Sequence, residues 1–211
     1  MTAVAKGNNI LGTGIELITI ALKQSYRVTA LVRDETKLRT LVRNPNLVII
    51  IGSPDVRSCV DQAMSLGQDA VVCCLGPKSP FYGDRTICSR AQPVINESMK
   101  AFGIKRLIAV SSQGVGMSYE QISCFQHLIG RFIAGRVLDD KERQEQAIQS
   151  SDLDYTIIRP GRLTWGPFTG NIRLNDQLKG GRISRKDLAF CIIKELSLGS
   201  WVGGTPTVNS Y

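Results

Sequence analysis

The segment LVIIIGSPDVRSCVDQAMSLGQDAVVCCLG, residues 47–76, decides the fold class because it holds one complete strand–helix–strand unit. Its two ends, 47–51 and 70–75, are short, apolar and free of charge, which predicts two buried β-strands. A helix is predicted over 55–66, where apolar residues recur at helical spacing after a proline. Two strands joined through a helix form a right-handed crossover and lie parallel in one sheet.

The same alternation continues on both sides of this segment. Strands are predicted over 28–32, 107–111 and 155–159, with a possible first strand over 2–5, and helices over 14–24, over 84–102 and before the last of these strands. Strands that alternate with helices predict an α/β protein. We therefore expect a single Rossmann-like domain over residues 1–211, with a doubly wound parallel sheet covered by helices on both faces.

The pattern changes after residue 159. The stretch RPGRLTWGPFTGN, residues 159–171, is rich in Gly, Pro and Thr and predicts a long loop over one end of the sheet. A last helix is predicted to begin at Ser184, since Asp187 stands three residues later at the spacing of a capping box, and to end at Gly199.

Composition narrows the functional classes. The 211 residues carry 26 Lys and Arg against 18 Asp and Glu, a formal charge of +8, but the basic residues are scattered among acids. Such scatter argues against nucleic-acid binding. No apolar stretch is long enough to span a membrane, and the first residues do not resemble a secretory signal. We expect a cytoplasmic protein, monomeric or homodimeric, whose partner is a small molecule.

The cysteines and the histidine do not form a metal motif. Cysteines stand at 59, 73, 74, 88, 124 and 191, without a CxxC pair, and His127 is the single histidine. Six thiols without a disulfide framework suggest a reducing compartment. Cys73 and Cys74 are adjacent in a predicted strand, so they point to opposite faces as small apolar residues, and His127 is read as structural.

Ligands of open parallel sheets bind at the carboxyl ends of the strands. The glycine-containing segment 7–14 lies between the possible first strand and the first helix, where glycines let the backbone approach a pyrophosphate. An ordinary glycine-containing loop explains it equally well. Arg33 ends the second strand at the place where NAD enzymes carry an acid, and its guanidinium suits the 2′-phosphate of NADP(H). The alternative is a surface arginine that starts the next helix.

The ordered motifs ILGTGIEL, VTALVRDETKL, GSPDV, QDAVVCCLG, MKAFGIKRLIAVSSQGVG, LDDKERQEQAIQSSDLDYTIIRPGRLT and GRISRKDLA resemble the NmrA-like atypical short-chain dehydrogenases/reductases. Within them the chain is most similar to the small biliverdin reductase B (flavin reductase)-like branch and to fungal oxidoreductases. The resemblance covers nearly the whole chain and implies a Rossmann fold that binds NADP(H) and reduces a flat aromatic substrate.

The resemblance also implies roles for individual residues. The glycine loop falls on Asn8 to Gly14 and matches best at its end, although Asn8 and Leu11 replace glycines of that branch. The implied cofactor-binding residues are Gly12, Thr13 and Gly14 at the pyrophosphate, Arg33 and Lys37 at the 2′-phosphate, Ser53 and Pro54 at the adenine, Leu75 and Gly76 toward the nicotinamide, Ser112 at the carboxamide, and Gly161, Arg162 and Leu163 in the covering loop.

Three residues are candidates for catalysis, each with a simpler alternative. Ser112 would polarise a substrate carbonyl or orient the nicotinamide, or else only satisfy a turn. Tyr119 lacks the Lys that normally follows the catalytic Tyr by four residues, since Ser123 stands there. Lys141 matches a polar pocket position and has Glu145 one turn later, as an i, i+4 pair that also suits a solvated helix face.

Trp165 and Phe168 in the 159–171 stretch either form an aromatic wall for a planar substrate or pack the loop on the core. The leading functional hypothesis is an NADPH-dependent oxidoreductase acting on a small aromatic, quinone-like or flavin-like substrate. The alternatives are a non-catalytic NADP(H)-binding regulator, as NmrA resemblance implies, and an isomerase or dehydratase on the same fold.

Overall fold

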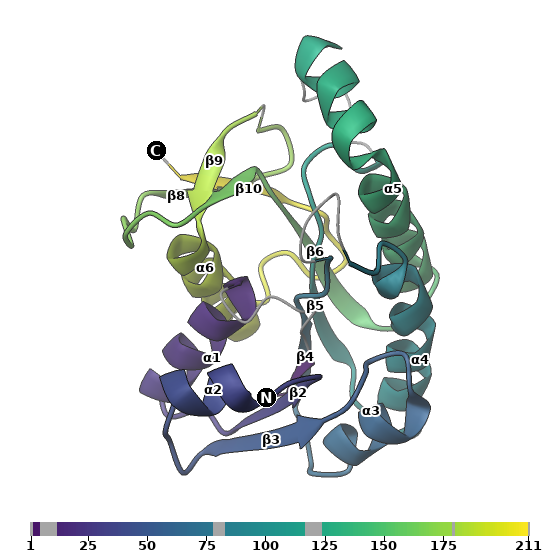
Figure 1. The fold of residues 1–211 in the computed structure, drawn as a ribbon, viewed down its shortest axis with the longest axis vertical. Helices are drawn as coiled ribbons and strands as arrows, with labels where there is room; N and C mark the ends of the chain where they lie inside the picture. Colours follow the sequence, from purple (N-terminus) through teal and green to yellow (C-terminus); the bar gives the residue numbers. More distant parts are fainter. Residues whose placement is uncertain (1, 5–11, 78–82, 117–123, 179, 211) are drawn as a thin grey trace.

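The computed structural model describes residues 2–4, 12–77, 83–116, 124–178 and 180–210, and not the side chains of 2–4, 37 and 124–134 (Figure 1). The strands are β1 (Thr2–Val4), β2 (Val28–Val32), β3 (Leu47–Ile51), β4 (Ala70–Cys73), β5 (Arg106–Val110), β6 (Asp154–Pro160), β7 (Arg162–Thr164), β8 (Ile172–Asn175), β9 (Arg182–Ser184) and β10 (Thr207–Ser210). The helices are α1 (Thr13–Lys23), α2 (Thr36–Leu41), α3 (Arg57–Met64), α4 (Ile87–Ala101), α5 (Cys124–Gln149) and α6 (Arg185–Leu198).

The main sheet has the strand order β3-β2-β1-β4-β5-β6-β10, and every neighbouring pair in it is parallel. The chain moves outward from β1 to β3, returns to β4 beside β1, and then moves outward on the other side. This reversal between β1 and β4 is the switch point at which open α/β sheets bind ligands. The predicted α/β fold with a doubly wound parallel sheet is confirmed.

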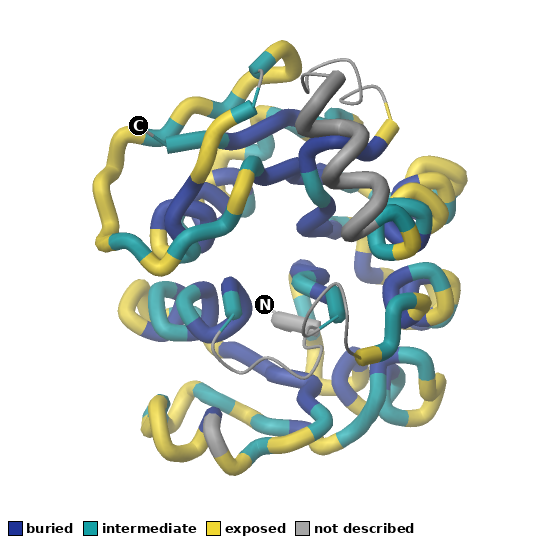
Figure 2. The backbone as a smooth tube through the Cα atoms, turned by 45° about the horizontal axis from the view of Figure 1, so that its top comes forward, coloured by how far each residue is buried: buried dark blue, intermediate teal, exposed yellow. Residues whose placement is uncertain are grey.

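Two apolar layers hold the helices against the sheet. Helices α1 and α6 pack together on one face, and α3, α4 and α5 cover the other (Figure 1). Figure 2 shows the buried residues along the strands and on the helix sides that face them. Val71 and Cys73 belong to the α3–α5 layer, whereas Val72 and Cys74 pack with the α1–α6 layer. The two adjacent cysteines therefore point to opposite faces, as predicted.

The final helix begins and ends as its sequence predicts. The Ser184 hydroxyl caps α6 by accepting a 3.0 Å hydrogen bond from the Asp187 amide. Gly199 closes the helix in the left-handed conformation, with a φ of 62°. The cap places Arg185 on the first turn of the helix.

The stretch 159–171 is not the continuous loop that was predicted. Strand β7 lies within it and pairs with β9, and β8 and β9 both pair with β10. These strands have three or four residues each and find their partners far along the chain, so local periodicity does not reveal them. Residues 165–171 remain irregular between β7 and β8.

Candidate cofactor and substrate site

Seven of the sequence-predicted site residues line one cavity of about 200 Å³ at the carboxyl ends of the central strands. It is lined by Gly12–Gly14, Cys74–Pro77, Val110, Ser111, Lys141, Leu163 and Arg185. Gly12, Thr13, Gly14, Leu75, Gly76, Lys141 and Leu163 were all predicted there. The cavity lies at the switch point between the two halves of the sheet.

The start of α1 forms one wall. Gly12 is its extended N-cap residue, and among the described residues no side chain caps the helix by hydrogen bonding. The first turn therefore presents backbone amides and the positive end of the helix dipole to the cavity. Glycines at 12 and 14 leave the backbone accessible, so this wall suits an anionic pyrophosphate.

Lys141 crosses from α5 to the strand ends. Its ammonium donates to the carbonyl oxygens of Leu75 and Val110, both at 2.7 Å, and to Oε1 of Gln144 at 3.0 Å. The residue is 5% exposed, and all three of its protons have acceptors. Lys141 thus fixes the ends of β4 and β5 and brings a positive charge to the cavity wall.

The expected pair between Lys141 and Glu145 does not form, and neither side chain lies on a solvated face. Glu145 instead accepts from Arg159 of β6, at 2.6 Å to Nη2 and 3.1 Å to Nε. Both partners are at most 5% exposed. The predicted pair does not form because α5 turns this polar face toward the sheet. Lys141 there meets the ends of β4 and β5, and Glu145 meets β6.

Ser111, and not its neighbour Ser112, is the serine that lines the cavity. Ser111 is 7% exposed, and its Oγ has no hydrogen-bond partner among the described residues. Its amide donates to the Ile158 carbonyl at 2.8 Å, which holds the residue against β6. The Ser112 hydroxyl donates to the Gln113 carbonyl at 3.2 Å, within its own turn. The geometry therefore favours Ser111 for the role expected of Ser112.

Arg33 stands directly after β2, next to the central strand β1 in the sheet order. It is half-buried, and its Nε is enclosed without a partner among the described residues. The two following acids are engaged locally: Asp34 accepts from the Thr36 amide at 2.9 Å, and Glu35 pairs with Arg39 at 2.6 Å. Arg33 is thus the cation at this strand end with an unused donor.

The remaining predicted residues lie around the cavity or outside the described part. Ser53 donates to Asp55 in the turn after β3, and Pro54 is buried beside it. Arg162 is exposed on β7 and is not among the lining residues. Tyr119 and the side chain of Lys37 lie outside the described residues.

The segment after β7 is attached to the start of α6. The Asp187 carboxylate accepts from the amides of Thr169 and Gly170 and from the Thr169 hydroxyl, at 2.9 to 3.0 Å. Burial alone would raise the pKa of Asp187, but these hydrogen bonds outweigh it and lower the pKa below its usual range. Asp187 therefore holds the segment down as a carboxylate.

The two aromatic residues of this segment pack on α6. The Phe168 ring meets Phe190 edge-on, with centroids 5.2 Å apart. The guanidinium of Arg185 lies 3.9 Å from the centroid of the Trp165 ring, although Trp165 is 60% exposed. Arg185, which the sequence analysis did not single out, is thereby placed on the cavity wall. A cation on the first turn of a capped helix beside a strand end was the available sequence signal.

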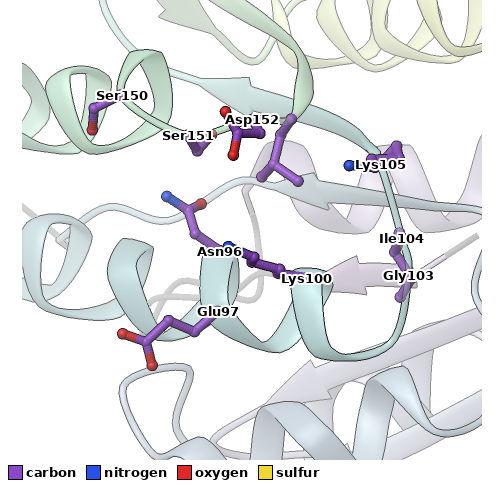
Figure 3. A pocket seen from close by; sticks show the side chains of 10 residues that line it. Asn96, Glu97, Lys100, Gly103, Ile104, Lys105, Ser150, Ser151 and Asp152 are labelled. Atoms are coloured by element: carbon purple, nitrogen blue, oxygen red, sulfur yellow. The ribbon is translucent and has the colours of Figure 1, made fainter.

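A second cavity of about 230 Å³ lies at the amino ends of β5 and β6, between the last turns of α4 and α5 (Figure 3). Its charged residues are of both signs, including Lys100, Lys105 and Asp152. None of the buried polar atoms without a partner in the described residues belongs to it. Since parallel sheets bind ligands at the opposite end, the cavity at β4 and β5 is the stronger candidate.

Two other features of the described residues bear on function. They contain no group of three or more His, Cys, Asp or Glu side chains arranged to hold a metal ion. They also contain no helix that is both long and apolar enough to cross a membrane.

Known proteins resemble this chain in sequence and in fold. A family model described as NAD(P)H-binding matches residues 12–197. A Bacillus subtilis protein named as an uncharacterized sugar epimerase, YhfK, is 28% identical over 176 residues, which cover 81% of this chain and 76% of that protein.

Solved structures share the fold across nearly the whole chain. ChuY of Escherichia coli O157:H7, described as an anaerobillin reductase, superposes with a TM-score of 0.81 at 22% identity, covering 99% of this chain and 96% of that one. A short-chain dehydrogenase/reductase of Veillonella parvula in complex with NADP gives a TM-score of 0.83 at 16% identity, covering 99% and 93%.

Proposed function

Because the chain belongs to the NAD(P)H-binding family, we propose that it is an NADPH-dependent oxidoreductase that reduces a small aromatic, quinone-like or flavin-like compound. A bound nicotinamide supplies the hydride. The chain's own residues bind the dinucleotide, orient it and place the acceptor over it, which is the usual division of labour in cofactor enzymes.

The observation that carries this proposal is the composition of the single cavity at β4 and β5. It joins the uncapped start of α1 to the Ser111 hydroxyl and to the Lys141 ammonium. The amides suit a pyrophosphate, and Ser111 has an unused hydroxyl to donate to a carbonyl oxygen of the nicotinamide or of the substrate. The protons of Lys141 are all held by acceptors, so we assign it to positioning the strand ends.

The proposed preference for NADPH over NADH rests on Arg33. A guanidinium can bind a 2′-phosphate with forked, charge-assisted hydrogen bonds, whereas an acid there would repel it. The enclosed Nε of Arg33 lacks a partner among the described residues, and Asp34 and Glu35 are turned to other groups. Both facts favour a phosphate at this strand end.

The first experiment measures NADPH and NADH affinity for the protein and for Arg33→Ala. Loss of a charged hydrogen-bonding partner should weaken NADPH binding about tenfold to a hundredfold and leave NADH affinity unchanged. Arg43→Ala is the matched control, since Arg43 is an exposed arginine just beyond α2. Equal losses for both nucleotides would contradict the assignment of Arg33, and no binding of either would remove the proposed function.

The second experiment follows NADPH oxidation with quinones, flavins and biliverdins as acceptors. Turnover with at least one of these classes supports the reductase. Tight NADPH binding without oxidation in the presence of any of them would reject it.

One observation favours a non-catalytic regulator as the second candidate. Short-chain dehydrogenases carry a Lys four residues after the catalytic Tyr, whereas Ser123 occupies that position relative to Tyr119. A protein partner whose affinity changes with NADP(H) would support the regulator. A redox-neutral isomerase, the kind of activity named for the B. subtilis relative, would turn over a substrate without consuming NADPH.

A further inference from the structure

Arg185 is a half-buried cation without a counter-ion among the described residues. Burial lowers the pKa of its guanidinium, which reports that the charge is partly removed from water. Its Nη1 is enclosed and has no hydrogen-bond partner among the described residues. Since burying an unpaired charge or donor costs free energy, such a group is normally kept for a ligand.

The same cavity holds a second unused donor. Ser111 is 7% exposed, lines the cavity together with Arg185, and has an unpartnered hydroxyl. None of the described lining residues is Asp or Glu, while Lys141 adds a further positive charge. The pocket is therefore electropositive, and Arg185 and Ser111 offer donors in addition to the amides of α1.

We propose that Arg185 forms a subsite for a carboxylate carried by the substrate, with Trp165 holding the guanidinium in place. The substrate is thus an aromatic acid, and its carboxylate binds at the start of α6 while its ring faces the Ser111 side of the cavity. This inference rests on the proposed dinucleotide site and adds the chemical class of its substrate.

Arg185 and the amides of α1 belong to different elements of the cavity wall. The amides of α1 begin at Gly12 and belong to the first crossover of the sheet. Arg185 instead shares its wall with Leu163 of β7 and is stacked on Trp165 of the segment that follows β7. That segment also lies on α6 through Asp187, so the cation is held by residues 165–171.

The test compares two ligands of the same shape, naphthoate and its neutral amide naphthamide, by calorimetric titration into the protein saturated with NADP⁺. A charge-assisted bond to a partly buried guanidinium should make naphthoate bind about tenfold more tightly or better. Arg185→Met should remove this preference and leave naphthamide and NADP⁺ affinities within about twofold of the wild type. Lys186→Met removes one charge from the adjacent exposed position and should change none of the three.

Two results would overturn the subsite: equal affinity of the wild-type protein for the two ligands, or weaker NADP⁺ binding by Arg185→Met with the naphthoate preference intact. The second result would assign Arg185 to the pyrophosphate. If the protein binds no NADP⁺, the proposed function fails separately, and the same comparison without nucleotide still decides whether Arg185 selects a carboxylate. An unchanged naphthamide affinity in Arg185→Met verifies that the cavity remains folded.

Discussion

Breaking the buried pair between Arg159 and Glu145 should destabilise the fold and loosen the candidate site. Its two hydrogen bonds are 2.6 and 3.1 Å long, and both side chains are at most 5% exposed. Arg159→Met leaves the Glu145 carboxylate buried and unpaired, and Glu145→Met does the reverse. Removing one partner of such a pair costs about 3–5 kcal/mol. For a chain of this size that is a decrease in Tm on the order of 10 °C.

The double variant, with Met at both positions, distinguishes the interaction energy of the pair from the effects of the single substitutions. It leaves no charge buried, so it should be much more stable than the sum of the single losses predicts, with a coupling energy of about 2 kcal/mol or more. Urea unfolding of the four proteins at neutral pH measures this directly. Additive losses, or single losses below about 1 kcal/mol, would refute the reasoning.

The predicted effect of Arg159→Met on the candidate site can be tested against a control variant. Residues on both sides of Arg159 hold the turn after β5, because Ile158 accepts from the Ser111 amide and Pro160 from the Gln113 amide. Arg159→Met should therefore also weaken NADPH binding. The second buried pair, Arg106 with Glu195 at 2.9 Å, lies at the opposite end of the sheet. Arg106→Met should destabilise the protein and leave the NADPH affinity of the folded fraction unchanged.

Two further predictions follow from individual groups. Asp187→Ala should lower the stability of the protein at pH 7. The folded-state pKa of Asp187 lies below its ordinary value of 3.8. The stabilisation by this carboxylate is therefore fully present above pH 3.8 and is lost as the pH falls through the lower folded-state pKa. The stability difference from wild type, measured by urea unfolding between pH 7 and pH 3, should shrink on acidification, and a constant difference would contradict the role. Burial raises the pKa values of the Cys88 and Cys191 thiols to about 12, so iodoacetamide at pH 8 should modify them far more slowly than Cys74. Because Cys74 lines the cavity, NADP⁺ should protect it from alkylation, and mass spectrometry that finds equal labelling with and without nucleotide would place the cofactor elsewhere.

The parts of the fold that the sequence predicts are those fixed by local chemistry. The strand bounds 28–32 and 47–51 agree with β2 and β3 to the residue, since each is a short run of apolar side chains. The predicted burial is confirmed for β2 and wrong for β3, because β3 is an edge strand on which Val48 and Ile51 are exposed. The start of α6 also follows from local chemistry, since Ser184 and Asp187 satisfy each other across three residues. Strands β7 to β10 depend on partners far along the chain, and no local pattern encodes that pairing.

The candidate site shows the same division. The glycines before α1 and the arginine after β2 follow strand ends, so position alone indicates them. Ser111 and Ser112 have the same side chain, and only the pairing of the Ser111 amide with β6 decides which hydroxyl enters the cavity. The sequence places Arg185 on the first turn of a capped helix, but only the structure shows that its Nη1 is enclosed without a described partner.

In the central part of α5, a stripe of polar side chains is buried, so the polar side of this helix does not mark its exposed side. Asp140, Lys141, Gln144 and Glu145 are all at most 5% exposed, whereas Glu142 and Arg143 are exposed. A helical stripe of four polar residues normally predicts a solvated face. Here each residue of the stripe has a specific partner, so burial is stable where the pattern predicts water.

Those partners also account for the rigidity that the site needs. Asp140 accepts from the Cys88 and Ser89 amides and so fixes the first turn of α4. Lys141 fixes the ends of β4 and β5, and Glu145 fixes the end of β6. One helix face therefore sets the relative positions of the strand ends that surround the cavity. In the proposed reductase, hydride donor and acceptor would have to be held in a fixed geometry, and this buried polar stripe would contribute to it by fixing the strand ends.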